Sequence, residues 1–167
     1  MKLLVKSTLM VAMLGLAACS QAGLGSNGAS GQYGAGAGAG GNYDPASPEY
    51  FNQTIGDRVF FAVDQSNLSA EAIATLDQQA NWLLSNPNYT AIIEGHADEQ
   101  GTREYNLALG ARRAASAQEY LISRGVAPNR LSTISYGKER PIEICSNEAC
   151  YSRNRRAVTV IAAGAGA

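Results

Sequence analysis

The residues GHADEQGTREYNLALGARRA (95–114) contain the only histidine of the chain, His96, together with three arginines and several carboxylates. They overlap the end of YTAIIEGHA (89–97), a short apolar run that is typical of a buried strand. Residues 103–124 follow a helical pattern, and Gly125 supplies the residue that commonly ends a helix. The stretch therefore predicts a strand, a charged loop and a helix in succession.

The same alternation extends in both directions along the chain. RVFFAVD (58–64) is predicted to be a buried strand, and apolar residues recur at helical spacing over 68–87, behind a capping Ser69. Two more strands are predicted at RLSTISYG (130–137) and RRAVTVIAA (155–163). Strands alternating with helices indicate an α/β fold, built as an α+β sandwich of two layers with right-handed crossovers. About 105 residues suffice for one core but not for two domains.

The first residues have the features of an export signal. Residues 1–6 are basic, and the apolar run over 9–18 is too short to span a bilayer. The sequence Leu16-Ala17-Ala18-Cys19 resembles the lipobox of bacterial lipoproteins, in which the signal is cleaved before a cysteine that is then acylated. We therefore expect residues 1–18 to be removed and Cys19 to be lipidated. An ordinary signal peptide with a chance cysteine is the alternative.

Gly, Ala, Ser and Asn dominate the residues that follow, as far as about residue 48. Such a composition cannot bury enough apolar surface to offset the entropy lost on ordering. The sequence thus predicts a lipidated N-terminus and flexible linker over 19–57, a folded domain over 58–162 and a disordered tail over 163–167.

Charge and cysteine content limit which partners and which covalent links can be expected. The chain has 13 basic and 14 acidic residues, and loss of Lys2 and Lys6 with the signal would change the formal charge from −1 to −3. This balance gives no reason to expect nucleic acid as a partner. Cys145 and Cys150 remain after lipidation, and in an exported protein they could form a disulfide worth about 2 kcal/mol. Spacing does not give geometry, so two free thiols stay an alternative.

The charged stretch is a poor match to an enzyme. Zinc sites need several His or Cys ligands, and His96 with Asp98 and Glu99 is an unsuitable set. A catalytic triad would need His96 as its base, and the chain has no G-x-S-x-G sequence. Asp98 and Glu99 are adjacent, and nearby arginines would lower their pKa values rather than raise one for acid catalysis. We expect neither catalysis nor a metal site.

A site that holds a charged ligand fits the spacing better. Asn106 and Arg113 are two helical turns apart, so both lie on one face of the predicted helix. Asp98 follows a strand, at the position where α/β sheets usually bind ligands. A carboxylate and a guanidinium held close together suit a zwitterion. A direct salt bridge between Asp98 and Arg113 is equally compatible with the pattern and stays open.

Three collinear motifs carry a family resemblance. IEGHADEQGTREYNLALGARRAASAQEYL (93–121), TISYGKERP (133–141) and NRRA (154–157) closely resemble the peptidoglycan-associated lipoproteins (Pal), members of the OmpA-like peptidoglycan-binding domain family. The resemblance covers roughly residues 58 to 161. It implies a βαβαβ(α)β domain with a mixed sheet, which binds peptidoglycan non-covalently through the diaminopimelate of the stem peptide. No cofactor and no catalysed reaction are implied.

The same resemblance implies roles for individual residues. Asp98 and Arg113 match the pair expected to hold the amine and the carboxylate of diaminopimelate. The other residues expected around the ligand are Asn106 as a support of the loop, Asp64 and Ser66 at the rim, one of Arg155 and Arg156 at the border, and Gly95 and His96 in supporting positions.

These expectations combine into one function. The resemblance implies a lipoprotein on the periplasmic face of the outer membrane, which tethers that membrane to the cell wall and works with TolB and other Tol proteins in cell division. One alternative is an OmpA-like anchor lipoprotein of another envelope machine. A peptidoglycan hydrolase dependent on His96, and a structural lipoprotein with an Asp98–Arg113 salt bridge and no ligand, are further alternatives.

Overall fold

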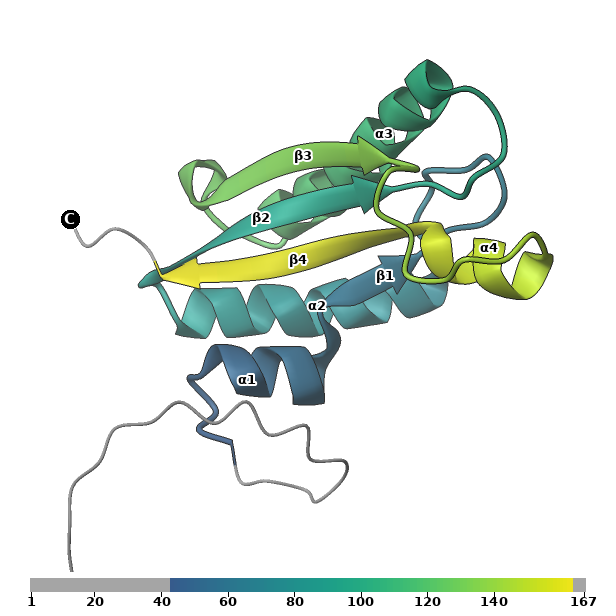
Figure 1. The fold of residues 1–167 in the computed structure, drawn as a ribbon. Helices are drawn as coiled ribbons and strands as arrows, with labels where there is room; N and C mark the ends of the chain where they lie inside the picture. The colour runs from purple at the N-terminus through teal and green to yellow at the C-terminus, as the bar shows by residue number, and fades with distance from the viewer. Residues whose placement is uncertain (1–42, 164–167) are drawn as a thin grey trace, which may run out of the picture. The chain divides into compact units, whose positions relative to one another are not determined.

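A four-stranded mixed sheet forms the centre of the protein (Figure 1). The computed structural model describes residues 43–163, so the predicted signal peptide, Cys19, most of the predicted linker and residues 164–167 lie outside the described part. The strand order is β1-β4-β2-β3, in which β2 and β3 are parallel and β4 is antiparallel to both β1 and β2. The predicted α/β fold with a mixed sheet is confirmed. The strands are β1 (Arg58–Phe60), β2 (Tyr89–His96), β3 (Leu131–Gly137) and β4 (Arg156–Ala163).

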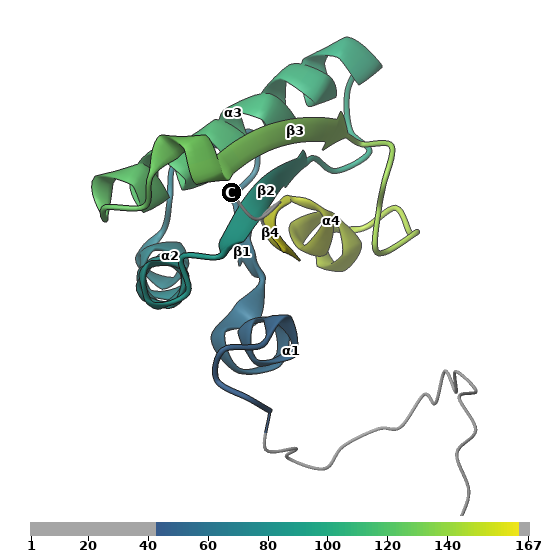
Figure 2. The ribbon, with the colours of Figure 1, turned by 90° about the vertical axis from the view of Figure 1, so that its left-hand side faces the viewer.

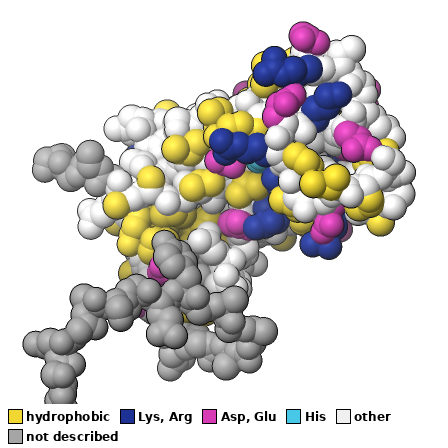
Figure 3. Space-filling view, viewed as in Figure 1, with side chains coloured by type: hydrophobic (Ala, Val, Ile, Leu, Met, Phe, Trp, Pro, Cys, Tyr) yellow, Lys and Arg dark blue, Asp and Glu magenta, His cyan; other side chains and the backbone are white. Residues whose placement is uncertain are grey.

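Two long helices, α2 (Ala70–Ser85) and α3 (Arg103–Ser123), cover one face of the sheet (Figures 1 and 2). The core lies between these two layers and includes Leu76 of α2, Ile93 of β2 and Leu121 of α3, all fully buried. The opposite face of the sheet has hydrophobic side chains with basic ones beside them (Figure 3). The two layers form because both helices bury their apolar sides against the same face of the sheet.

Local signals explain where the two long helices begin and end. The hydroxyl of Ser69 accepts a hydrogen bond from the backbone N–H of Ala72 at 3.2 Å, which caps α2 as predicted. Thr102 caps α3 in the same way, because its side chain accepts from the N–H of Tyr105 at 3.2 Å. After α3 the chain turns at Gly125, whose φ of +102° is readily adopted only by glycine.

The folded part begins earlier than the sequence predicted. A short helix α1 (Pro48–Tyr50) leads into the π-helical segment η1 (Phe51–Gly56), so the prediction of a flexible linker up to residue 57 is wrong for these residues. Phe51 is fully buried and packs edge-on against Trp82, with ring centroids 5.0 Å apart. The indole N–H of Trp82 donates to the carbonyl oxygen of Pro45 at 2.7 Å. A capping Ser47 followed by proline was the sequence signal for this helix.

The first strand is shorter than predicted and lies at the edge of the sheet. β1 ends at Phe60, and both Arg58 and Phe60 are exposed, so the prediction of a buried strand over 58–64 is wrong. The chain leaves the sheet after Phe60 and reaches Asp64, the only non-glycine residue with positive φ (55°) among residues 43–163. This turn directs residues 61–66 toward the C-terminal end of β2.

Two smaller helices complete the chain. η2 (Pro128–Arg130) precedes β3, and α4 (Glu148–Asn154) lies in the connection between β3 and β4. α4 is the additional helix that the family resemblance implied. No helix within residues 43–163 has the length and apolar character needed to cross a membrane.

Strand β2 and helix α3 touch each other through two glycines. A β-carbon added to Gly95 would lie 1.8 Å from the carbonyl oxygen of Gly110, and one added to Gly110 would lie 2.5 Å from the hydroxyl of Ser135. Helix and strand backbones can approach this closely only where neither residue has a side chain. The contact holds Asn106 and Arg113, on either side of Gly110, against the end of β2.

Candidate ligand-binding site

A hollow of about 310 Å³ lies where the loops after β1 and β2 meet the start of α3. Its walls combine polar and apolar groups, which suits a ligand with charged ends and an aliphatic middle. Three residues of the predicted site line it: Asp98, Asp64 and Asn106. The remaining lining residues are Val63, Gln100, Gly101, Tyr105 and Leu109.

Asp98 is an almost buried carboxylate at the edge of this hollow, with an exposed fraction of 7%. Its Oδ1 accepts the backbone N–H of Gln100 at 3.1 Å, and its Oδ2 lies 3.1 Å from Nη1 of Arg155. Among the ion pairs within residues 43–163, none joins Asp98 to Arg113. The direct salt bridge that the sequence left open is therefore not formed, and the cation beside Asp98 is Arg155.

Arg113 is fully buried and is not among the residues that line the hollow. Its guanidinium donates to three backbone carbonyls, those of Gln65 at 2.8 Å, His96 at 2.9 Å and Ala62 at 3.2 Å. Burial lowers the pKa of Arg113 to about 10, and the nearby carboxylate of Asp98 opposes this shift, so the side chain stays charged at neutral pH. Arg113 thus joins the loop after β1 to the end of β2 and keeps a buried positive charge near Asp98.

The two arginines of the NRRA motif point to different places. Arg155 contacts both Asp98 and Glu148, and its Nε donates to the carbonyl of Phe61 at 3.2 Å. Arg156 instead donates to the carbonyls of Asn154 and Arg140 and does not line the hollow, so the prediction that includes it among the binding residues is not supported by its position. Neither arginine lines the hollow, but Arg155 reaches its edge through the contact with Asp98.

Asn106 and Lys138 hold the loop between β2 and α3, and Tyr105 of α3 contacts the loop after β1. Asn106 donates to the carbonyl of Gln100 at 2.7 Å, which is the supporting role that the sequence predicted. Lys138 donates to the carbonyl of Gly101 at 2.7 Å, and Tyr105 donates a hydrogen bond to Asp64. The sequence analysis missed Lys138 and Tyr105, because neither residue type signals a contact with a distant loop. Ser66 is half-buried and does not line the hollow.

Comparisons with known proteins identify the family to which the chain belongs. Residues 60–155 match the OmpA family. The peptidoglycan-associated lipoprotein of Rhizobium meliloti is 52% identical over 169 residues, which cover 99% of this chain and 93% of that protein. The chain belongs to the OmpA family, and within it to the peptidoglycan-associated lipoproteins.

Other relatives extend the comparison within and beyond this family. The peptidoglycan-associated lipoprotein of Brucella melitensis is 55% identical over 131 residues, 78% of this chain and 76% of that protein. The crystal structure of the peptidoglycan-associated lipoprotein from Burkholderia pseudomallei matches with a TM-score of 0.66 and 35% identity, over 71% of this chain and 100% of that chain. The C-terminal domain of Helicobacter pylori MotB shares the fold alone, with a TM-score of 0.60 and 22% identity over 65% of this chain and 86% of that one.

The histidine of this OmpA-family chain is buried away from the hollow. His96 has an exposed fraction of 1%, packs against Tyr136, and has its Nε2 atom 3.5 Å from a carboxylate oxygen of Glu94. Burial, and then the charges of Arg156 and Arg140, lower the pKa of His96 to about 4. A neutral, inaccessible imidazole is a poor general base, which argues against a hydrolase that depends on it.

We expect His96 to make stability depend on pH. The unfolded chain would protonate this residue near pH 6.5 and the folded chain only near pH 4, so its contribution is complete above pH 6.5 and is lost as the pH falls toward 4. Between pH 7 and pH 5 the loss should be about 2 kcal/mol. Denaturant unfolding at both pH values should show a decline that is smaller by this amount in His96→Asn. Equal declines in the two proteins would contradict the assignment.

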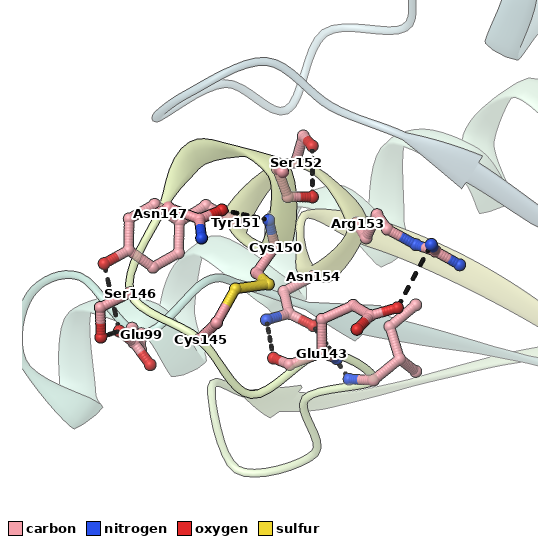
Figure 4. Close-up of a disulfide and its surroundings, with 12 residues drawn as sticks. Glu99, Glu143, Cys145, Ser146, Asn147, Cys150, Tyr151, Ser152, Arg153 and Asn154 are labelled. Atoms are coloured by element: carbon pink, nitrogen blue, oxygen red, sulfur yellow. Dashed lines mark hydrogen bonds and ion pairs between the residues drawn. A yellow bond between two sulfur atoms is a disulfide. The ribbon is translucent and has the colours of Figure 1, made fainter.

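The cysteine pair closes a turn beside the site. Cys145 and Cys150 are joined by a disulfide, with Cα atoms 5.9 Å apart (Figure 4). Glu99, the residue after Asp98, accepts hydrogen bonds from the hydroxyls of Ser146 at 2.9 Å and Tyr151 at 3.1 Å. The disulfide turn and the loop that carries Asp98 are thereby connected.

Removal of the disulfide should destabilise the folded protein modestly. Loop-closure entropy predicts that Cys145→Ser with Cys150→Ser lowers the free energy of unfolding by about 2 kcal/mol. Denaturant titration of the oxidised protein and the double variant measures this difference. A reducing agent should lower the stability of the unaltered protein and leave that of the variant unchanged. If reduction had no effect on the unaltered protein, the disulfide would not contribute as described.

Other features of the described residues offer weaker sites. A hollow of about 480 Å³ beside Trp82 and Pro45 has no charged side chain in its walls. Within residues 43–163 no group of three or more His, Cys, Asp or Glu side chains is arranged to hold a metal ion. The hollow beside Asp98 has two carboxylates in its walls, which makes it the candidate site for a ligand with a positive charge.

Proposed function

We propose that this chain is an outer-membrane lipoprotein, anchored by lipid at Cys19, that binds the diaminopimelate of peptidoglycan stem peptides without catalysing a reaction. The observation that carries the proposal is the hollow lined by the carboxylates of Asp98 and Asp64, in which Asp98 is paired with the guanidinium of Arg155. The names of its relatives as peptidoglycan-associated lipoproteins support peptidoglycan as the binding partner.

The chemistry of diaminopimelate matches the groups around the hollow. Its side chain ends in an ammonium and a carboxylate on one carbon, and methylene groups connect that carbon to the peptide. Asp98 and Asp64 can accept the ammonium, whereas Arg155 offers a bidentate guanidinium to the carboxylate. Val63 and Leu109 provide apolar surface for the methylene groups. A ligand lacking either charge would gain only one of these two contacts, which provides selectivity.

The ends of the domain support a tethering role. Ala46 lies near the start of the described chain. It borders the same hollow as Tyr89, the first residue of β2, and Ala163, the last residue of β4, so the chain enters the domain at this end of the sheet. Asp98 follows the other end of β2, and the eight residues of that strand span roughly 25 Å. In Figure 1 the described chain accordingly starts at the side of the sheet away from α4. A domain attached at one end and binding at the other suits a bridge between two layers of the envelope.

Many weak bridges can hold two surfaces together while each one exchanges. Tethered copies raise the effective concentration of their binding sites, so the individual affinity for a stem peptide need not be high. Partnership with TolB and other Tol proteins during cell division is part of the proposal and follows from the family resemblance. Co-purification of TolB with the full-length protein tests that partnership separately.

Binding to isolated cell walls tests the proposal. Full-length protein in detergent should sediment with purified sacculi, and free meso-diaminopimelate should release it. Asp98→Asn should reduce retention on the order of tenfold or more, because a buried charged contact to the ligand is lost. Glu104→Gln, an equal charge change on an exposed residue of α3, should bind like the unaltered protein. Equal retention of Asp98→Asn would overturn the assignment of the site.

A further inference from the structure

Arg155 is a single cation held between two carboxylates of different accessibility. Its Nη1 atom lies 3.1 Å from Asp98 and 3.4 Å from Glu148, and its Nη2 atom also contacts Glu148. The side chain of Asp98 is 10% exposed and that of Glu148 is 66% exposed. Burial opposes the charge of Arg155, but the hydrogen bonds that it donates to Glu148 and Asp98 outweigh this and raise its pKa. Glu148 is therefore the partner that can leave at little cost in desolvation.

Glu148 lies in a turn that is held by a helix cap and a disulfide. It is the first residue of α4, and the side chain of Asn147 caps that helix by accepting from the N–H of Cys150 at 3.3 Å. The disulfide between Cys145 and Cys150 closes the turn, and Figure 4 shows Glu99 reaching across to its neighbours Ser146 and Tyr151. Because the turn is fixed, little entropy opposes the contact between Glu148 and Arg155.

We propose that Glu148 is an internal competitor that occupies the guanidinium of Arg155 in the place of a ligand carboxylate. The proposal rests on the proposed function and adds an exchange to it: a carboxylate of the ligand binds as that of Glu148 moves into solvent. The number of charges at Arg155 is the same before and after, so loss of the Glu148 contact offsets part of the free energy gained from the ligand carboxylate. The apparent affinity is reduced by the fraction of molecules in which Glu148 is in place.

The exchange predicts selectivity for a free carboxylate. A ligand whose corresponding group is a carboxamide has no negative charge to offer Arg155, so it gains nothing when Glu148 leaves. Removing the charge of Glu148 should thus strengthen binding of the free acid specifically. A contact between Glu148 and the ligand ammonium would have the opposite consequence, because removal of the charge would weaken binding of both forms.

The test uses the full-length protein in detergent and two synthetic stem tripeptides, which carry meso-diaminopimelate with its distal carboxyl either free or amidated. Glu148→Gln should bind the free acid roughly three- to tenfold more tightly than the unaltered protein by calorimetric titration, and the amidated peptide equally. Glu143→Gln is the matched control, since Glu143 lies in the same connection but pairs with the exposed Arg153 at 3.3 Å. It should bind both peptides like the unaltered protein.

The outcomes separate this proposal from the one on which it rests. If the unaltered protein bound the free acid but Glu148→Gln bound it equally or less tightly, the exchange would be overturned and the ligand site would stand. An equal gain for the amidated peptide, or the same gain in Glu143→Gln, would also overturn it. Failure of the unaltered protein to bind either peptide would overturn the proposed function and the exchange together. Unchanged thermal unfolding of both variants shows that a gain comes from binding.

Discussion

Gly95→Ala is expected to destabilise the protein by on the order of 3 kcal/mol or more, enough to unfold much of a domain of ordinary stability. The added β-carbon would lie 1.8 Å from the carbonyl oxygen of Gly110, which is backbone and cannot rotate away. Helix α3 would have to move off strand β2, and the loop that carries Asp98 connects these two elements. Denaturant unfolding monitored by circular dichroism measures the change.

Gly125→Ala is the matched control for this prediction. Gly125 has a φ of +102°, but a β-carbon there meets its nearest atom at 3.9 Å. The substitution should cost only about 1 kcal/mol, from backbone strain rather than from a clash. Similar losses in the two variants would mean that the approach of α3 to β2 is not as close as described.

Arg113→Met should have the second largest effect, on the order of 4 kcal/mol in the free energy of unfolding. The substitution leaves the carbonyls of Ala62, Gln65 and His96 without their donor, and each unsatisfied buried carbonyl costs about 1 to 3 kcal/mol. Arg113→Lys should recover only part of the loss, because one ammonium group cannot reproduce the geometry of a guanidinium. Thermal and denaturant unfolding provide the measurement.

The adjacent arginine provides the comparison. Arg112 is exposed on the same helix, so Arg112→Met should change stability by no more than about 0.5 kcal/mol. A comparable loss in the two variants would remove the special role given to Arg113. Because Arg113→Met alters the fold as well as the buried charge near Asp98, reduced ligand binding by this variant alone is no proof of direct contact.

Much of the fold was predictable because its signals are local. Ser69 and Gly125 mark helix ends through side-chain capping and a positive φ, and both effects depend on a few neighbouring residues. The N-terminal helices were missed because they are short, and Phe51 is buried by a contact with Trp82 that is 31 residues away (82 − 51). The edge position of β1 depends on the strand order, which no local pattern contains.

In the site, too, residues placed by local sequence patterns were predicted, whereas contacts between residues distant in sequence were not. Asp98 and Asn106 lie where the strand and helix periods predicted, and both line the hollow. The partner of Asp98 was not predictable from spacing, because Arg155 reaches it across a separation of 57 residues. Gly110 was also missed, although an isolated glycine within a helical pattern often indicates close packing. Its contact with Gly95 positions the whole charged stretch.

Calorimetric titration with two stem tripeptides tests the central claim most directly. One carries meso-diaminopimelate and the other lysine, which differs only in lacking the distal carboxylate. If Asp98 and Arg155 recognise the ammonium and the carboxylate together, the full-length protein should bind the diaminopimelate peptide at least about tenfold more tightly than the lysine peptide. Asp98→Asn should weaken binding of both. Equal affinity for the two peptides, or no binding of the diaminopimelate peptide, would contradict the account.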